Sequence, residues 1–288
     1  MKALLICPDE RFGVAALAES VPLSNVPILG KSLLEYWLEH LAALGAKEVC
    51  VLAVDRPDQV LAGVGNGARW GLRVIVQPDK RERTLDEARA EHQTNDDATW
   101  LPAPNDVILM DRLPCLPQLP LFTSHADWFA AARELMPRAL TPDRIGVREI
   151  KPGVWVGLNA HVASDVNLIA PCWIGERAWI EAGVTIGPNT VLEREVFIAR
   201  GAEISHSAIG PETFVGQFTE VRNSIAWGST LINWARDSCV KVTDAFLLCS
   251  REPQRVRRAP AKSSARLRLR EFVGELPPSV VAEFNPPR

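Results

Sequence analysis

Few side chains in this sequence of 288 residues combine reactive chemistry with a position that would present it to a ligand. Histidine is the side chain that most often acts as a general base near neutral pH, and two of the five histidines, His161 and His206, lie in a region of regular repeats. Asp111 directly follows the apolar run Val107–Met110, and the end of a parallel strand is where such sheets bind ligands. We therefore weigh proton transfer at a histidine and ligand binding at Asp111, each against an ordinary solvated side chain.

The region around both histidines follows a period of six residues. Every sixth position is aliphatic, at Val156, Val162, Leu168, Ile174, Ile180, Ile186, Leu192, Ile198 and Ile204. The residue two positions before each of these is small or β-branched, and after Ile204 the pattern shifts by one residue and resumes at Ile209. Helices repeat every 3.6 residues and strands every two, so this period instead predicts stacked coils of short parallel strands with the aliphatic side chains inside.

This pattern resembles that of the hexapeptide-repeat proteins, whose fold is an all-β, left-handed parallel β-helix. Many of those proteins are acyltransferases that work as trimers, with a donor such as acetyl-CoA and a histidine between subunits as general base. The resemblance makes His206 and His161 candidates for that role. His161 directly precedes the inward Val162 and His206 follows the inward Ile204 by two positions, so both should point outward. Solvated surface histidines are the alternative.

Length and composition predict a soluble protein of about two domains. Hydrophobic residues make up 47% of the chain and charged residues 23%, and no apolar run approaches the roughly 20 residues of a membrane span. The six cysteines are scattered without a Cys-x-x-Cys pair. This usage favours reduced thiols in a cytoplasm over disulfides or a zinc site.

The basic charge is concentrated near the end of the chain. Arg251–Arg270 contains eight basic residues and one acidic residue. A basic run can bind nucleic acid, but neither interleaved aromatic residues nor a known binding module accompanies this one. We therefore expect no nucleic-acid and no membrane partner, and we expect the run to pack against acidic parts of this chain or of a neighbouring subunit.

The first half of the chain reads as alternating strands and helices, which is typical of a parallel sheet covered by helices. Strands are predicted over Lys2–Cys7, Glu48–Val54, Leu72–Gln77 and Val107–Met110, and helices over residues 33–44, 84–91 and 124–135. We divide the chain into an α/β domain over 1–128, a linker over 129–150, the β-helix over 151–250 and a basic, proline-containing tail over 251–288.

A second resemblance covers the N-terminal domain. Val21–Tyr36 reads VPLSNVPILGKSLLEY and Ala68–Leu72 reads ARWGL, and both are similar to segments of the sugar-nucleotide pyrophosphorylases. These nucleotidyltransferases join a nucleoside triphosphate to a sugar 1-phosphate, and several carry a left-handed β-helix after the catalytic domain. The resemblance implies a shortened Rossmann-like nucleotidyltransferase sheet, Mg²⁺ bound at Asp111 and a phosphate near Lys31. A strand-end or helix-capping aspartate and a solvated lysine are the alternatives.

The same resemblance shows what this chain lacks. The family's phosphate loop, of the form G-G-x-G-T-R, falls on Pro8–Gly13, where the glycines are replaced and the arginine position is Gly13. Pro8 removes a backbone donor, while Asp9 and Glu10 would repel a triphosphate. The span between Asp111 and the first coil is also too short for the family's sugar-binding half. We therefore expect the nucleotidyl-transfer site to be inactive.

A narrower resemblance lies in the β-helix. Phe218–Ser224 reads FTEVRNS and is similar to a segment of the bifunctional N-acetylglucosamine-1-phosphate uridylyltransferase/glucosamine-1-phosphate acetyltransferase family. That family's catalytic histidine falls on Asn233 here, and an amide cannot act as a general base near neutral pH. The resemblance implies that Arg222 and Arg236 bind a phosphate or carboxylate of the substrate, with surface arginines as the alternative.

Two functions remain open. One is a transferase of nucleotide-sugar or sugar-phosphate metabolism, acting on a sugar phosphate or a nucleotide sugar. The other is a non-catalytic regulatory or scaffolding subunit of the same family. In both cases we expect a homotrimer through the β-helix, with the outward Trp155, Trp173 and Trp179 at the subunit interface. The sequence names no particular nucleotide, sugar, acyl donor or protein partner.

Overall fold

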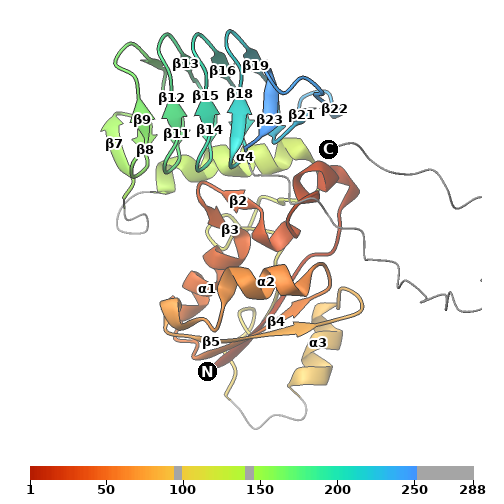
Figure 1. Ribbon diagram of the computed structural model, residues 1–288. Coiled ribbons are helices and arrows are strands. Elements are labelled where there is room, and N and C mark those ends of the chain that lie inside the picture. Colours follow the sequence, from red (N-terminus) through yellow and green to blue (C-terminus); the bar gives the residue numbers. More distant parts are fainter. Residues whose placement is uncertain (94–98, 140–145, 252–288) are drawn as a thin grey trace, which may run out of the picture. The chain divides into compact units, whose positions relative to one another are not determined.

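The computed structural model describes residues 1–93, 99–139 and 146–251. Residues 1–252 form one compact unit, in which an α/β part precedes a parallel β-helix (Figure 1). The prediction of a parallel α/β region followed by a β-helix is therefore confirmed. Apart from Arg251, the predicted basic tail lies outside the described residues. None of the helices in the described ranges is long and apolar enough to cross a membrane.

The α/β part is built on a sheet of parallel strands in the order β5-β4-β1-β6. Their bounds are Lys2–Ile6 for β1, Glu48–Ala53 for β4, Arg73–Pro78 for β5 and Val107–Leu109 for β6. β1 pairs with β4 on one side and with β6 on the other, and its residues from Ala3 to Ile6 are buried. This strand order, 3-2-1-4, is that of the first four strands of a Rossmann-type sheet, and each strand lies within one residue of its predicted bounds.

The predicted helices of the α/β part begin at capping residues. α1 (Leu33–Ala43) and α3 (Leu85–His92) each start with a capping box, in which the N-cap hydroxyl and a glutamate accept from each other's backbone N–H. The pairs are Ser32 with Glu35 and Thr84 with Glu87. The sequence analysis did not predict helix α2 (Pro57–Val64) or the hairpin of β2 (Pro27–Ile28) and β3 (Lys31–Ser32). It also did not predict the short 3₁₀ helices η1 (Phe12–Ala18), η2 (Leu23–Asn25), η3 (Ala68–Trp70) and η4 (Met136–Arg138).

The coils of the β-helix contribute their strands to three sheets. Sheet one contains β8 (Val154–Val156), β11 (Cys172–Ile174), β14 (Thr190–Leu192), β17 (Ala208–Ile209) and β20 (Ser224–Trp227). Sheet two contains β9 (His161–Val162), β12 (Trp179–Ile180), β15 (Phe197–Ile198) and β18 (Thr213–Val215). Sheet three contains β10 (Asn167–Leu168), β13 (Thr185–Ile186), β16 (Glu203–Ser205) and β19 (Glu220–Arg222).

The inward side chains follow the predicted period. Every sixth residue from Ile174 to Ile204 is fully buried. Neighbouring coils pair Ile174 with Leu192, 18 residues further on, but pair Ile204 with Val221, 17 residues further on. The shift of the pattern after Ile204 is therefore a coil shortened by one residue, which keeps the aliphatic side chains stacked.

Antiparallel strands lie at both ends of sheet one. β7 (Arg148–Lys151) pairs with β8, while β21 (Thr230–Asn233) and β22 (Ser238–Lys241) extend the sheet beyond β20. β23 (Leu248–Ser250) pairs antiparallel with β18 in sheet two. Regular coiling therefore ends at β20, and the rest of the described chain folds back against the coils.

Helix α4 (His125–Leu135) lies along the outer face of sheet one (Figure 1). Trp155 and Trp173 project from this face and are only 5% and 1% exposed. Trp128 of α4 meets Trp227 edge to face, with ring centroids 6.0 Å apart. The prediction that Trp155 and Trp173 lie at a subunit interface is therefore wrong, because residues of the same chain bury them. Trp179, on sheet two, is 45% exposed.

A buried carboxylate joins the β2–β3 hairpin to the β-helix. Glu193 follows β14 and is fully buried, and its oxygens accept from the backbone N–H groups of Leu29 at 2.6 Å and Gly30 at 2.8 Å. Leu29 and Gly30 have φ values of 51° and 81°, a conformation that aims successive N–H groups at one anion. Two charge-assisted hydrogen bonds therefore connect the hairpin to the β-helix.

Replacing Glu193 by alanine should lower the free energy of unfolding by about 3 kcal/mol, because the buried N–H group of Leu29 and that of Gly30 lose a charged acceptor. Glu195 in the same coil is the matched control, since it is partly exposed and pairs with Arg177. Its replacement by alanine should cost less than about 1 kcal/mol. Urea unfolding of both variants measures the difference, and equal losses would contradict the role of Glu193.

A second buried carboxylate ties α3 to the sheet. Asp106 directly precedes β6 and is 6% exposed. It accepts hydrogen bonds from Arg89 Nε at 2.9 Å and from Gln93 Nε2 at 3.1 Å. The hydrogen bond from Arg89 is the main reason that the pKa of Asp106 falls from its ordinary value of 3.8 to about 2.

A depressed pKa in the folded state means that ionised Asp106 stabilises the fold above about pH 4, and that this contribution is lost as the pH falls towards about 2. Asp106→Asn should therefore lower the free energy of unfolding by about 2 kcal/mol at neutral pH and flatten its pH dependence in that acidic window. Asp86→Asn is the control, because that carboxylate near Arg89 is 98% exposed. Urea unfolding across the acidic range tests this; an unchanged acid limb in Asp106→Asn would refute it.

Candidate functional site

The segment Pro8–Gly13 follows β1 at the carboxyl end of the sheet, where parallel sheets bind ligands. The Glu82 carboxylate of the same chain binds two donors of this segment. The backbone N–H of Asp9 donates to Glu82 Oε2 at 2.7 Å, and Arg11 Nη2 lies 2.7 Å from both oxygens of that carboxylate. The loop therefore presents to Glu82 the groups that would otherwise bind an anion.

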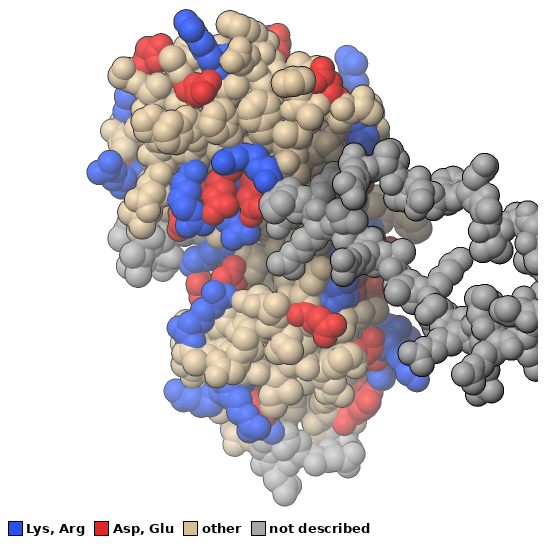
Figure 2. Space-filling model, viewed as in Figure 1, with Lys and Arg blue, Asp and Glu red and all other residues tan. Residues whose placement is uncertain are grey.

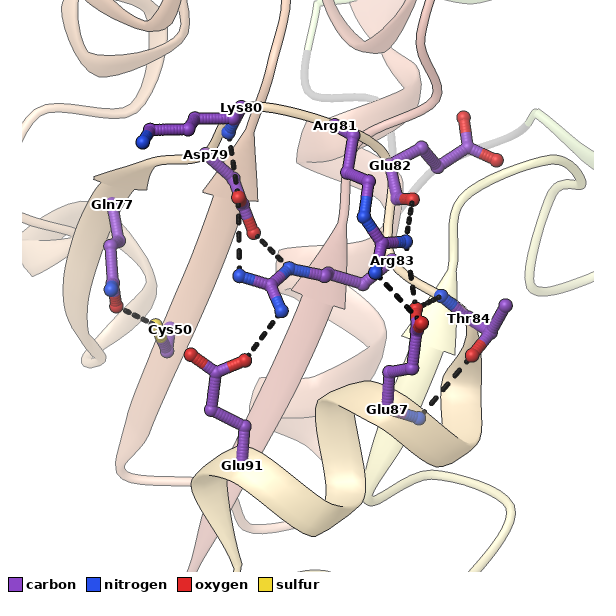
Figure 3. Close-up of polar contacts among 10 residues, drawn as sticks. All are labelled: Cys50, Gln77, Asp79, Lys80, Arg81, Glu82, Arg83, Thr84, Glu87 and Glu91. Carbon is purple, nitrogen blue, oxygen red and sulfur yellow. Dashed lines mark hydrogen bonds and ion pairs between the residues drawn. The ribbon is translucent and has the colours of Figure 1, made fainter.

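The loop that carries Glu82 is held by further ion pairs (Figure 3). Arg83 Nε donates to Asp79 Oδ2 at 2.7 Å, and Arg81 donates from both Nη atoms to Glu87 at 2.9 and 2.7 Å. Hydrogen bonding from these guanidinium groups lowers the pKa of Asp79 and lowers that of Glu87 to about 2. Both carboxylates are therefore ionised at neutral pH, and their ion pairs keep the backbone next to Glu82 in place.

The space on another side of Pro8–Gly13 is filled by the segment that precedes α4. A Cβ on Gly13 would lie 2.1 Å from the carbonyl oxygen of Thr123, so the two backbones are in direct contact. Only glycine fits there. The segment is thus packed against protein on one side and bound to Glu82 on another, unlike a glycine-rich loop that leaves its N–H groups open to a phosphate.

Asp111 lies just after β6 at the same end of the sheet, with a side chain that is 43% exposed. Its Oδ1 is 3.6 Å from Arg112 Nε, and its backbone carbonyl accepts from the N–H of Leu121. A neighbouring guanidinium competes with a cation for this carboxylate. Among the described residues, no three His, Cys, Asp or Glu side chains gather so that they could hold a metal ion. Binding of Mg²⁺ at Asp111 stays a prediction.

Lys31 lies on β3, next to the start of α1. Its Nζ is 2.7 Å from Glu39 Oε2 and 5.9 Å from the centre of the Tyr36 ring. A phosphate at Lys31 would have to compete with the Glu39 carboxylate for the ammonium group. The structure therefore adds no support to phosphate binding there.

His206 lies at a corner between sheets three and one, with a φ of 49°. The Asn189 amide Nδ2 is 3.4 Å from His206 Nδ1. This contact holds one ring nitrogen of His206 against an amide of the neighbouring coil. Trp234 Nε1 donates to the His206 carbonyl at 3.0 Å, so the end of β21 packs against this corner.

Of the other residues predicted for acyl transfer, Arg222 pairs with Ser205, next to His206, and Asn233 directly precedes Trp234, which contacts the His206 carbonyl. His161 stacks on Trp179 on sheet two, with ring centroids 4.1 Å apart. Asn233 and Arg236 are in contact with each other, because Asn233 Oδ1 accepts from the backbone N–H of Arg236 at 3.0 Å. That contact shapes the turn after β21 and engages the backbone of Arg236. It gives no evidence for a substrate site.

Arginines on the β-helix surface are paired with carboxylates. Arg222 contacts Glu203 at 3.2 Å and also contacts Glu220, and Arg177 Nε donates to Glu195 at 2.7 Å. Figure 2 shows the same mixture, with blue and red side chains side by side in one band of the β-helix. A phosphate or carboxylate at Arg222 would have to displace both glutamates, so anion binding there also stays a prediction.

One buried histidine was missed by the sequence analysis. His125 begins α4, is 6% exposed, and has Nδ1 3.5 Å from Asp237 Oδ1. Burial lowers its pKa, and Asp237 opposes that shift. Nothing in the local sequence signals this burial, because it arises only when α4 packs against the turn between β21 and β22.

A cavity of about 460 Å³ lies where the α/β part meets the β-helix. Its walls contain two ion pairs, Arg69 to Glu35 at 2.7 Å and Arg194 to Glu212 at 3.5 Å. The α/β part contributes Glu19, Ser20, Val21, Asn25, Pro27, Gly30, Ser32, Glu35, Gly63 and Arg69, and the β-helix contributes Arg194, Pro211, Glu212, Trp227, Gly228, Ser229, Thr230 and Ser250. Sequence reasoning missed it because its lining joins segments that are far apart in the chain.

Comparison with known proteins gives a partial match. No family model matches the chain. A curated relative, glucose-1-phosphate thymidylyltransferase from Streptomyces griseus, is 31% identical over 81 residues, which are 28% of this chain and 23% of the relative. The chain thus spans less than a quarter of that relative's length. The match supports a relationship to the sugar nucleotidyltransferases, and it does not confirm the narrower resemblance to the bifunctional uridylyltransferase/acetyltransferase.

Proposed function

We propose that this chain is a transferase-family protein of nucleotide-sugar or sugar-phosphate metabolism in which nucleotidyl transfer has been lost. The similarity to a thymidylyltransferase and the Rossmann-type strand order support the family. The observation that carries the loss is the Glu82 carboxylate, which binds the Asp9 N–H and the Arg11 guanidinium. A loop whose donors hold an internal carboxylate does not present them to a triphosphate.

Electrostatic repulsion acts in the same direction. A triphosphate at this loop would approach the carboxylates of Asp9, Glu10 and Glu82. Each unit of like charge at 4 Å costs about 1 kcal/mol in water and more where water is excluded. To bind a triphosphate, Arg11 would also have to give up its ion pair with Glu82, so the net gain in binding free energy would be small. The substituted loop thus opposes the first step of nucleotidyl transfer.

The alternative is a non-catalytic regulatory or scaffolding subunit that binds a sugar phosphate or a nucleotide sugar without turnover. Asn233 favours it over acyl transfer, because this residue, at the position of the related family's catalytic histidine, has no titratable group. Thermal-shift measurements distinguish an acyltransferase from a non-catalytic subunit. Stabilisation by acetyl-CoA would favour an acyltransferase, whereas stabilisation by a nucleotide sugar alone would favour the non-catalytic subunit.

With Mg²⁺, the five common nucleoside triphosphates and glucose 1-phosphate or N-acetylglucosamine 1-phosphate, the protein should release no pyrophosphate above background. Glu82→Gln should raise the affinity for triphosphate several-fold, because it removes a charge from the loop and frees Arg11, but it should not restore turnover. A coupled pyrophosphate assay and calorimetry measure these quantities.

Glu91→Gln is the control for Glu82→Gln, since Glu91 pairs with Arg83 in the neighbouring loop without touching Asp9 or Arg11. It should leave triphosphate affinity unchanged. Pyrophosphate release by the unmodified protein would overturn the proposed loss of nucleotidyl transfer.

We propose in addition that the homotrimer expected from the β-helix uses sheet two. Sheet one is covered by α4 and the α/β part, whereas sheet two carries a row of stacked rings on its outer face. These rings are His161, Trp179, Phe197 and Phe214. Exposed aromatic rows of this kind usually mark an interaction surface.

Light scattering at micromolar concentration should therefore report three copies per particle. Trp179→Glu should shift the protein towards monomers, because a charge would be buried against the partner's rings. Asn167→Glu, at an exposed position on sheet three, should leave the assembly unchanged. A monomeric unmodified protein would rule out this assembly.

A further inference from the structure

Helix α4 meets the turn between β21 and β22 through four side chains, which we call the junction. His125 and Phe129 are four residues apart on α4, so they share one face of the helix. The ring of Phe129 packs on that of Trp234, with centroids 5.1 Å apart. His125 Nδ1 lies 3.5 Å from Asp237 Oδ1. The junction therefore holds the start of α4 against the end of the β-helix.

The imidazole of His125 is enclosed in the junction. The residue is 6% exposed, and among the described residues neither ring nitrogen has a hydrogen bond of good geometry. Burial lowers the pKa of His125, and the Asp237 carboxylate opposes this shift without cancelling it. The side chain of Asp237 is itself 78% exposed, so water screens its attraction for a positive charge. The ring is therefore neutral at pH 7.

The other surroundings of the ring offer little to a proton. His125 is the first residue of α4, where the helix dipole is positive. Asp127, the acidic residue of the first turn, is bound to the Ser124 hydroxyl at 2.8 Å. Sheet one contributes apolar side chains, such as Trp173, to the core that contains α4. Among the described residues, Asp237 is thus the charged group that acts on the ring.

The junction adjoins the segment that packs on the loop after β1. Thr123 lies two residues before His125, and its carbonyl oxygen is so close to Gly13 that no Cβ would fit there. We infer that the junction is an acid-sensitive latch. A proton on His125 separates the start of α4 from the β21–β22 turn and loosens the packing of Thr123 on Gly13, while the coils stay folded.

Acid favours the open form of the latch, in which the ring is exposed. On opening, the pKa of His125 returns towards its ordinary value of 6.5. Because the closed form binds the proton less well, closure has its full strength above about pH 6.5 and weakens as the pH falls below it. The ratio of closed to open molecules then falls by up to about tenfold for each pH unit.

Amide hydrogen exchange of the full chain at about pH 7.5 and about pH 5.5, expressed as protection factors, tests the latch. The reporters are Asp127 and Trp128, whose N–H groups both bind Ser124. Their protection should fall several-fold, and by up to about tenfold, at the lower pH. Protection in β13 and β14 of the coils should stay the same. Equal protection of the reporters at the two pH values would overturn the inference.

Three variants assign the effect to the junction. His125→Gln removes the titrating group and should abolish the pH dependence of the reporters. His40→Gln is the matched control, because His40 is a partly buried histidine on α1 whose pKa is also lowered by burial, and it should leave the pH dependence unchanged. Asp237→Asn should enlarge the loss at low pH, because it removes the carboxylate that favours the proton in the closed form.

A loss that persists in folded His125→Gln, or one that becomes smaller in Asp237→Asn, would contradict the latch. Should His125→Gln fail to fold, NMR titration of the ring protons in the unmodified protein decides. The midpoint for His125 should lie below 6.5, its ordinary value, and a midpoint at or above that value would overturn the inference. No substrate is added in these measurements, so their outcome is independent of the proposed function.

Discussion

The structure depends on one sheet of the β-helix that is apolar on both faces. Its inward side chains, such as Ile174 and Leu192, fill the interior of the coils, while outward side chains such as Trp173 and Val191 belong to the core of the α/β part. Burial of apolar surface is the largest favourable term in folding, and here a single sheet contributes to two cores. The buried side chains of helix α4 belong to the same core as those of the α/β part and pack on the outer face of this sheet, which explains why the chain from the first strand to the last coil forms one compact unit.

The features that could be predicted from the sequence are those that depend on local spacing. The inward positions of the coils follow from a period of six, because each coil repeats the same short geometry. The strands of the α/β sheet follow from short apolar runs next to capping residues such as Ser32 and Thr84. In contrast, Trp155 and Trp173 were assigned to the wrong surroundings. Their spacing shows that their side chains point away from the interior of the coils, but it cannot show that α4 of the same chain covers them.

Only part of the chemistry of the loop after β1 could be predicted from the sequence. The loss of the glycines and the presence of Asp9 and Glu10 indicated that a triphosphate would not bind. The bond from Arg11 to Glu82 joins residues 71 positions apart, and in the sequence Glu82 is one charge within a run of charges that would normally be solvated. Such a pairing depends on the tertiary fold, as does the cavity. In this structure the chain itself supplies an anion, Glu82, to the backbone of Asp9 and to Arg11 in this loop.

The antiparallel strands at the two ends of sheet one limit how far the column of coils can grow. A parallel β-helix ends in strand edges with unpaired N–H and C=O groups, which could recruit the edge of another molecule. Here β7 runs against β8 at one end, and β21 and β22 run against β20 at the other. The outermost strands, β7 and β22, are fully exposed and each carries lysine. Short edge strands that carry lysine disfavour pairing of the columns end to end along this sheet.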